Sequence, residues 1–196
     1  MKHLKYSVSV MMVLALALVF IGCAKPPEAE QKAAQAAMDA AVTAGADKYA
    51  VADLQAAKKL WEDAEAQVKD KKYKEAKQVY VDAKAAFEKA TAAVAAGKKA
   101  ATDEANAAIA ALEEGWKSIE DSVKKIEKKL KDQKEAWEAD AKSFVDGLKA
   151  TKEMIAADPL GAKTKAGELK TVVEKWDAAF KEMAAAPAKP ETKKKK

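Results

Sequence analysis

The chain has 196 residues and a formal net charge of +5, with 36 basic residues, all of them lysine, against 31 acidic ones. Its single cysteine excludes an internal disulfide, and one cysteine with one histidine is too few for a His/Cys zinc site. The histidine, His3, lies in the leader described below, so the expected mature chain has no Cys–His dyad. Alanine, lysine and glutamate dominate the composition, and no segment has the alternating pattern of a β-strand, so we expect an all-α fold. Because catalytic and metal-binding residues are lacking, we expect a non-enzymatic chain without a cofactor.

The first 22 residues have the pattern of a secretory signal peptide. Residues 2–5 carry positive charge, residues 8–21 are almost entirely apolar, and Gly22-Cys23 closes the run. An uncleaved membrane anchor is the alternative, but the run is shorter than the roughly 20 residues that a bilayer span needs. We therefore expect cleavage between Gly22 and Cys23.

The residues around this boundary resemble a known modification motif. Phe20-Ile21-Gly22-Cys23 resembles the lipobox of bacterial lipoproteins, and the resemblance implies that Cys23 becomes a lipidated N-terminus. Two or three acyl chains, at about 0.8 kcal/mol per buried methylene, anchor a protein firmly. Ala24, where inner-membrane lipoproteins carry Asp, implies the outer membrane. Residues 23–30 would then form the lipidated, Pro-rich spacer, and a buried, inert cysteine is the disfavoured alternative.

A helical domain is expected over residues 31–184, and its first part predicts a helical hairpin. A first helix runs from Glu28 to about Ala44, where Gly45 suits a C-terminal cap. Apolar residues three and four apart then predict helices on either side of a short turn at residues 70–72. Helices joined so closely pack antiparallel, which places the hairpin at about 51–96. Whether the second helix continues through Gly97 is left open by the pattern.

The clearest periodicity lies in a predicted heptad helix at about 102–157. Its seam positions lie three and four residues apart: Ile109, Leu112, Trp116, Ile119, Val123, Ile126, Leu130, Gln133 and Trp137. After Trp137 the frame shifts by an insertion of four residues. A continuous helix over 73–133 would reach about 90 Å. Because tryptophan is bulky for a symmetric two-stranded seam, we favour packing within the chain over a long parallel dimer, and the oligomeric state stays open.

The C-terminal part predicts one more helix and a basic tail. Asp158-Pro159 ends the heptad helix, because proline removes a backbone donor. The last helix is expected at about 163–184. Residues 185–196 should be disordered, and their five lysines, which could contact an anionic polymer, are Lys189, Lys193, Lys194, Lys195 and Lys196.

Two further resemblances concern the helical part. Residues 44–90 resemble a helical-hairpin family of unknown function in Gram-negative lipoproteins. The matching positions are Tyr49, Leu54, Ala57, Tyr73 and Ala76. A weaker similarity to the murein lipoprotein family rests on Cys23, the seam at 109–130 and the terminal Lys196, and it implies covalent attachment of that lysine to peptidoglycan.

These observations predict an elongated antiparallel bundle or coiled coil, held in the outer membrane and facing the periplasm. The expected role is structural or tethering, with contact to peptidoglycan or another envelope protein through the lysine tail. The alternative is a periplasmic adaptor or chaperone-like module that recruits a protein partner through exposed aromatic residues. Trp61, Tyr80 and Trp176 are the candidates, although we expect each of them to pack in the core. Nucleic acid is not an expected partner, because the lysine clusters alternate with acidic residues and arginine is absent.

Overall fold

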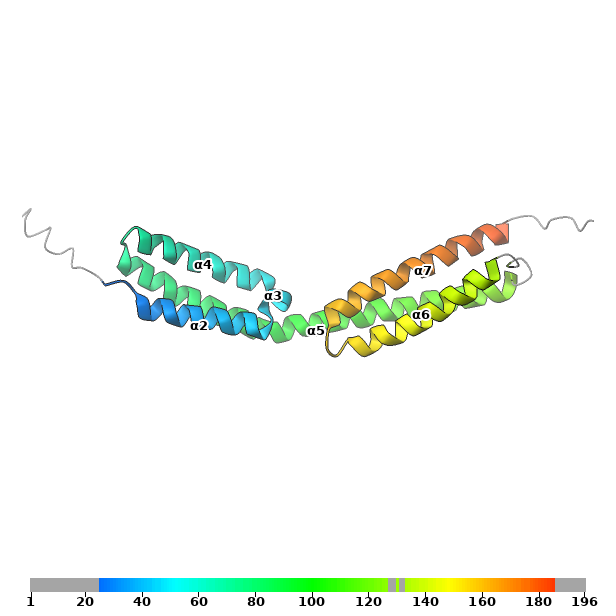
Figure 1. Cartoon of the computed structure of the whole chain (residues 1–196), viewed down its shortest axis with the longest axis horizontal. Coiled ribbons are helices and arrows are strands. Elements are labelled where there is room, and N and C mark those ends of the chain that lie inside the picture. The colour runs from blue at the N-terminus through cyan, green and yellow to red at the C-terminus, as the bar shows by residue number, and fades with distance from the viewer. Residues whose placement is uncertain (1–24, 127–129, 131–132, 186–196) are drawn as a thin grey trace, which may run out of the picture. The chain divides into compact units, whose positions relative to one another are not determined.

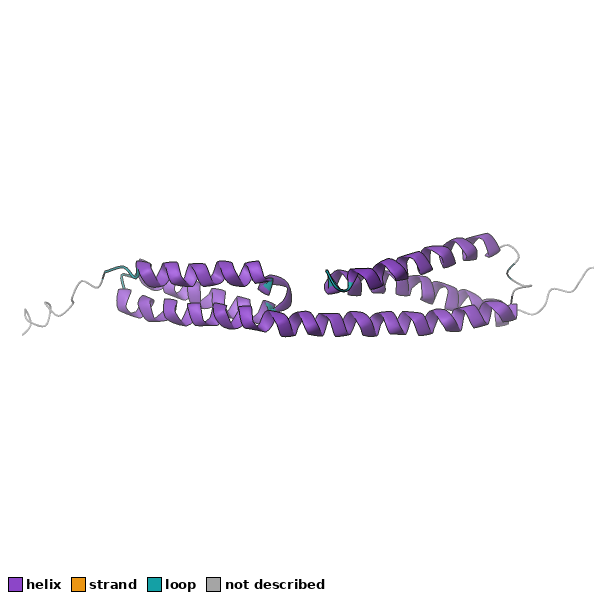
Figure 2. Ribbon diagram, turned by 90° about the horizontal axis from the view of Figure 1, so that it is seen from below, coloured by secondary structure: helices purple, strands orange, loops and turns teal. Residues whose placement is uncertain are grey.

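A computed structural model describes residues 25–126, 130 and 133–185. The described residues form helices joined by short turns, without a strand among them, which confirms the all-α class (Figure 2). The helices are α2 (Glu28–Ala44), α3 (Ala46–Tyr49), α4 (Val51–Lys69), α5 (Tyr73–Ile126), α6 (Lys134–Met154) and α7 (Pro159–Ala185). They fall into two compact units, unit 1 up to Ala95 and unit 2 from Ala96 onward, with α5 contributing to both.

The first helix has the bounds that its sequence predicts. Gly45 takes a left-handed φ of 93° and its backbone N–H bonds to the carbonyls of Ala41 and Val42, which closes α2. Glycine adopts this conformation without steric cost. The one-turn helix α3 that follows was not expected, because four residues are too few to show a helical period.

Unit 1 is a three-helix arrangement in which α4 runs antiparallel to α2 and α5 (Figure 1). Lys89 of α5 pairs with Asp53 near the start of α4 at 2.8 Å, whereas Tyr80 of α5 bonds to Glu65 near its end. Lys77 pairs with Glu30 at 3.0 Å, so the start of α2 lies beside the start of α5. The core is built mainly from small residues, with a few large side chains: Ala34, Ala41, Ala57, Ala64, Ala83, Ala90, Leu54, Tyr80 and Phe87.

The helical hairpin has the expected short turn. α4 ends in a Schellman motif, in which the N–H groups of Lys71 and Lys72 donate to the carbonyls of Val68 and Gln67. The left-handed position of this motif is occupied by Lys71, with φ 60°. α5 then continues through Gly97 to Ile126, which answers the question that the sequence left open.

The predicted single helix over 102–157 is wrong. α5 ends at Ile126 and α6 begins at Lys134, so the continuous helix also stops short of Gln133. Residues 127–133 separate the two helices, and 127–129 and 131–132 lie outside the described part. Seven residues equal one heptad, so the three-and-four spacing of apolar residues continues in the sequence across this segment. The frame shift after Trp137 belongs to the separate apolar face of α6, so it is not an insertion within one coiled coil.

Unit 2 repeats the arrangement with α5, α6 and α7. Trp116 of α5 stacks on Trp137 near the start of α6, and Glu113 pairs with Lys152 near its end, so α6 is antiparallel to α5. Lys163 near the start of α7 pairs with Glu104 at 2.6 Å, so α7 runs parallel to α5. The seam residues of α5 thus pack within their own chain.

The break at Asp158-Pro159 is confirmed, and α7 begins at Pro159, earlier than the predicted residue 163. Asp158 Oδ1 accepts a hydrogen bond of 3.0 Å from the backbone N–H of Gly161. An aspartate cap followed by proline at the first helical position is a strong helix start. None of the described helices combines the length and hydropathy that a bilayer span requires.

Candidate functional site

The residues predicted to carry the modification and the basic tail lie outside the described part of the chain. These are Gly22 and Cys23 at one end, and Lys189, Lys193, Lys194, Lys195 and Lys196 at the other. The described chain starts at Lys25, and α7 ends at Ala185. The signal peptide, the lipidation and the disorder of the tail therefore stay predictions.

Unit 1 contains a partly buried polar cluster that joins its three long helices. The Tyr80 hydroxyl of α5 donates to the Glu65 carboxylate of α4, and Gln31 Nε2 of α2 donates to the same carboxylate oxygen at 2.7 Å. The Tyr80 side chain is fully buried, and the Trp61 ring meets it edge-on at 5.2 Å between ring centroids. One carboxylate thus fixes the register of α2 and α5 against α4.

The surroundings of Tyr80 keep its hydroxyl protonated. Burial, the hydrogen bond to Glu65 and the negative charge of that carboxylate raise the pKa of Tyr80 well above its ordinary value of about 10. A phenol whose pKa is raised in this way stays protonated near neutral pH. The cluster is suited to holding helices together, which is a structural task.

The three aromatic residues considered for an exposed binding face do not form one. Tyr80 is fully buried, Trp176 is 2% exposed, and Trp61 is half-buried against Tyr80. The Trp176 indole N–H donates to Asp140 at 2.9 Å inside unit 2, so it is already satisfied. Core packing, which was the expected place of each of these side chains, accounts for them, and the alternative of an exposed aromatic face is wrong.

A different set of aromatic rings forms the centre of unit 2. The Trp116 ring stacks on Phe144 at 4.0 Å and on Trp137 at 5.1 Å between centroids, with interplanar angles of 13° and 17°. Trp137 also meets Trp176 and Phe180 edge-on, at 5.3 and 5.2 Å. Such ring pairs add about 0.5–1.5 kcal/mol each beyond their buried area.

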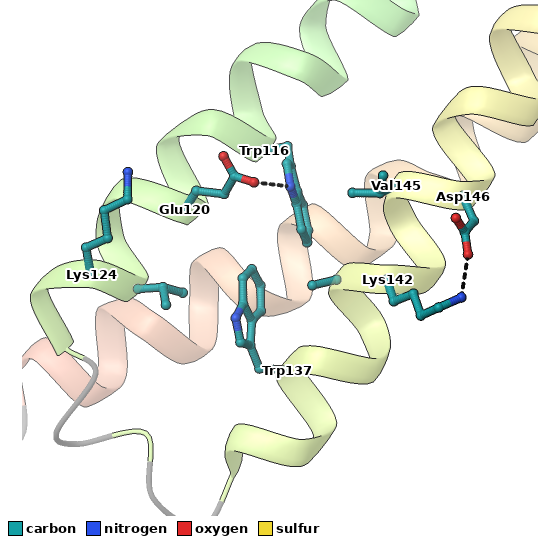
Figure 3. A pocket seen from close by; sticks show the side chains of 9 residues that line it. Trp116, Glu120, Lys124, Trp137, Lys142, Val145 and Asp146 are labelled. Atoms are coloured by element: carbon teal, nitrogen blue, oxygen red, sulfur yellow. Dashed lines mark hydrogen bonds and ion pairs between the residues drawn. The ribbon is translucent and has the colours of Figure 1, made fainter.

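A pocket of about 640 Å³ opens beside these rings, between α5 and α6 (Figure 3). Its lining combines two tryptophan rings, small apolar side chains and a charged rim: Trp116, Glu120, Val123, Lys124, Trp137, Ala141, Lys142, Val145 and Asp146. Val145, at its rim, is 53% exposed. The pocket therefore offers apolar surface that water reaches.

The charged residues at the pocket are engaged with their own helix neighbours. Glu120 accepts a hydrogen bond of 3.0 Å from the Trp116 indole, and Lys142 pairs with Asp146 at 2.9 Å (Figure 3). Within the described residues, no group of three His, Cys, Asp or Glu side chains is arranged to hold a metal ion. The arrangement is suited to apolar contact with a charged border.

The sequence did not single out this pocket. Trp116 and Trp137 both belong to the predicted seam, where they were expected to be core residues, and each is indeed mostly buried. They lie side by side because α6 runs antiparallel to α5. The heptad spacing gave no sign of this reversal, because it is the same for one continuous helix. The bulk of tryptophan at a seam position was the available signal.

The described geometry defines an all-α protein with two units, each built around three long helices, with a polar cluster in the first and an aromatic pocket in the second. Comparisons with protein-family models, with curated proteins and with solved structures gave no match.

Proposed function

We propose that the chain is a non-enzymatic lipoprotein, anchored in the outer membrane through lipid on Cys23, that presents its two helical units in the periplasm. In this proposal residues 1–22 are removed, Cys23 becomes the lipidated N-terminus, and the protein has a structural or tethering role. The N-terminal sequence pattern motivates the anchor.

The observation that carries the proposal is how soon the folded chain begins after Cys23. Pro27 is buried, its carbonyl accepts a 2.9 Å hydrogen bond from Gln31, and α2 starts at Glu28. Only three residues, 24–26, lie between Cys23 and Pro27, so the two Cα atoms are at most about 14 Å apart. A lipid on Cys23 would hold unit 1 directly at the bilayer surface, as expected of a device that positions a folded body at a membrane.

The ionisable groups of the described units support a role without catalysis. Lysines and acids pair along single helices, as in Lys99–Asp103, and between helices, as in Lys175–Asp140. Lys175 and the Trp176 indole hold the pKa of Asp140 below its ordinary value, so this carboxylate stays ionised at neutral pH. These groups stabilise helices and helix contacts.

The tail after α7 supplies the second contact in this proposal. Lys189 and Lys193–Lys196 would attract peptidoglycan or another anionic envelope component, with an attraction that salt weakens. The protein would then be attached at its N-terminus by lipid and at its C-terminus by charge.

Labelling with a palmitate analogue tests the anchor. The wild-type protein should incorporate the label and its mature mass should begin at a modified Cys23, whereas Cys23→Ala should incorporate none. Retention of the leader, or an unmodified thiol in the native protein, would refute the proposal. Isolated sacculi test the tail: deletion of residues 186–196 should release the protein at lower salt than the full chain requires.

A second function, recruitment of a protein partner, is favoured by one observation, the apolar pocket beside Trp116 and Trp137. A partner captured by the secreted Cys23→Ala form should be lost in Val145→Lys, because that change places a charge over the pocket. The matched control is Val81→Lys in unit 1, at a similarly exposed valine (46%) away from the pocket. Equal capture by both variants would exclude the pocket as the recruiting site.

A further inference from the structure

The turn between α4 and α5 carries a cluster of lysines on the surface of unit 1. Residues 69–74 read Lys-Asp-Lys-Lys-Tyr-Lys, and all four lysines are exposed. Lys72 pairs with Asp70 at 3.1 Å, whereas Lys69, Lys71 and Lys74 form no ion pair with any described residue. We call residues 69–74 the basic turn. Its net charge is +3, with Glu75 directly after it and Glu28 and Glu30 at the start of α2 as the nearby acidic residues.

The basic turn lies at the end of unit 1 from which the chain leads back to Cys23 (Figure 1). Gln31, in the first turn of α2, bonds to Glu65, one helical turn before Lys69. Glu30 pairs with Lys77, one helical turn after Lys74. Because a helical turn rises only about 5.4 Å, the start of α2 and the basic turn share one end of the unit.

The other end of unit 1 has no such excess of lysine. The segment from residue 39 to residue 53, which contains the α2–α3 junction, holds Asp39, Asp47 and Asp53 against one lysine, Lys48. Lys89 compensates Asp53. With Lys48 and Lys89 against these three aspartates, the net charge of this end is −1, so the lysine cluster is confined to the end nearest to Cys23.

The backbone of the basic turn gives an independent indication. Lys71 occupies the left-handed position of the Schellman motif at φ 60°, a conformation that disfavours side chains with a Cβ. Glycine is the residue that stability alone would select there, as at Gly45. A lysine, in place of glycine, at this strained position points to a use for its charge.

We propose that the basic turn is a docking surface for anionic phospholipid headgroups. The inference rests on the proposed function, since lipid on Cys23 would bring this end of unit 1 to the bilayer. The basic turn would then add an electrostatic contact that orients the unit with its long helices directed away from the membrane. The chemistry fits because lysine ammonium groups donate to phosphate oxygens without needing a fixed geometry.

Vesicle sedimentation with the mature chain carrying Cys23→Ala tests the surface without the anchor. The protein should bind vesicles of equal parts phosphatidylglycerol and phosphatidylcholine, and should not bind pure phosphatidylcholine. A triple variant, Lys69→Gln with Lys71→Gln and Lys74→Gln, should lower the partition coefficient by about fivefold per lysine, roughly 100-fold in total. Circular dichroism should show that the variant stays folded, because these side chains are exposed.

The matched control removes the same charge elsewhere in unit 1, with Lys48→Gln, Lys58→Gln and Lys59→Gln at exposed positions. It should keep most of the binding. Repeating the comparison in chains ending at Ala185 removes the contribution of the tail lysines. Equal losses in the triple variant and its control would overturn the inference.

Two further outcomes distinguish lipid docking from a cell-wall contact and from failure of the proposed anchor. If the triple variant loses binding to sacculi while keeping binding to anionic vesicles, the basic turn is a wall contact and the lipid assignment is wrong. If vesicle binding follows the basic turn but palmitate labelling of Cys23 fails, the docking surface is supported and the anchor alone is refuted. Lys71→Arg should keep binding, since it preserves the charge.

Discussion

Tyr80→Phe should weaken unit 1 specifically, because it removes one of two donors to a carboxylate that joins three helices. The aromatic ring remains, so the packing against Trp61 is retained and no cavity forms. A hydrogen bond to a charged group contributes about 1.5–3 kcal/mol. Glu65 is half-buried, which allows water to replace part of the lost bond, so we expect the lower end of that range, about 1.5 kcal/mol.

Hydrogen exchange of the mature chain measures this effect unit by unit. A loss of about 1.5 kcal/mol corresponds to roughly tenfold faster exchange for the amides of α2 and α4 that exchange through opening of unit 1. The amides of α6 and α7 serve as an internal control. Tyr49→Phe is the matched variant, since the half-buried Tyr49 hydroxyl bonds to none of the described residues.

Exchange that stays within twofold of wild type in α2 and α4 would refute the role assigned to the polar cluster. Acceleration that is equal in both units would also refute it. The pH dependence gives a second check, because the pKa of Tyr80 is raised in the folded state. The stability that it contributes is complete below the unfolded value of about 10 and is lost as the pH rises above it. Tyr80→Phe should lack this alkaline loss.

Three smaller predictions concern helix ends and one carboxylate. Asp158→Ala should cost about 1 kcal/mol in urea unfolding, because the cap on Gly161 is lost, and Asp158→Asn should recover most of it. Lys71→Gly should raise the free energy of unfolding in urea by up to about 1 kcal/mol, because glycine adopts the left-handed conformation without strain. Lys72→Gly, at a neighbouring position with negative φ, should not raise it. Asp140→Asn should flatten the acid unfolding of unit 2: the pKa of Asp140 is lowered in the folded state, so its contribution is present above about pH 4 and is lost as the pH falls.

The parts of the fold that could be predicted are those set by local signals. Gly45 ended α2 at the expected residue, and Asp158-Pro159 separated α6 from α7. Each signal acts within a few residues, through a cap or a missing donor, so it can be read without knowing the partners. The short turn after Lys69 predicted the hairpin for the same reason.

The fold-back between Ile126 and Lys134 could not be predicted in this way. Its length is close to one heptad, so apolar residues keep the same spacing whether the chain continues as one helix or reverses. The stacking of Trp116 on Trp137 depends on that reversal, and with it the pocket between α5 and α6. The lysines of the basic turn can be found in the sequence, but their position beside the start of α2 cannot be predicted from it.

Composition and periodicity by themselves determined that this chain is all-α and that its helices are amphipathic. Only the tertiary structure decided which helices share a core, that α5 serves two units, and that Tyr80 and Trp176 are buried rather than available to a partner. The physical reason is range. Helix formation is governed by contacts three or four residues apart, whereas burial, stacking and the neighbourhood of a charge depend on residues brought together from distant parts of the chain.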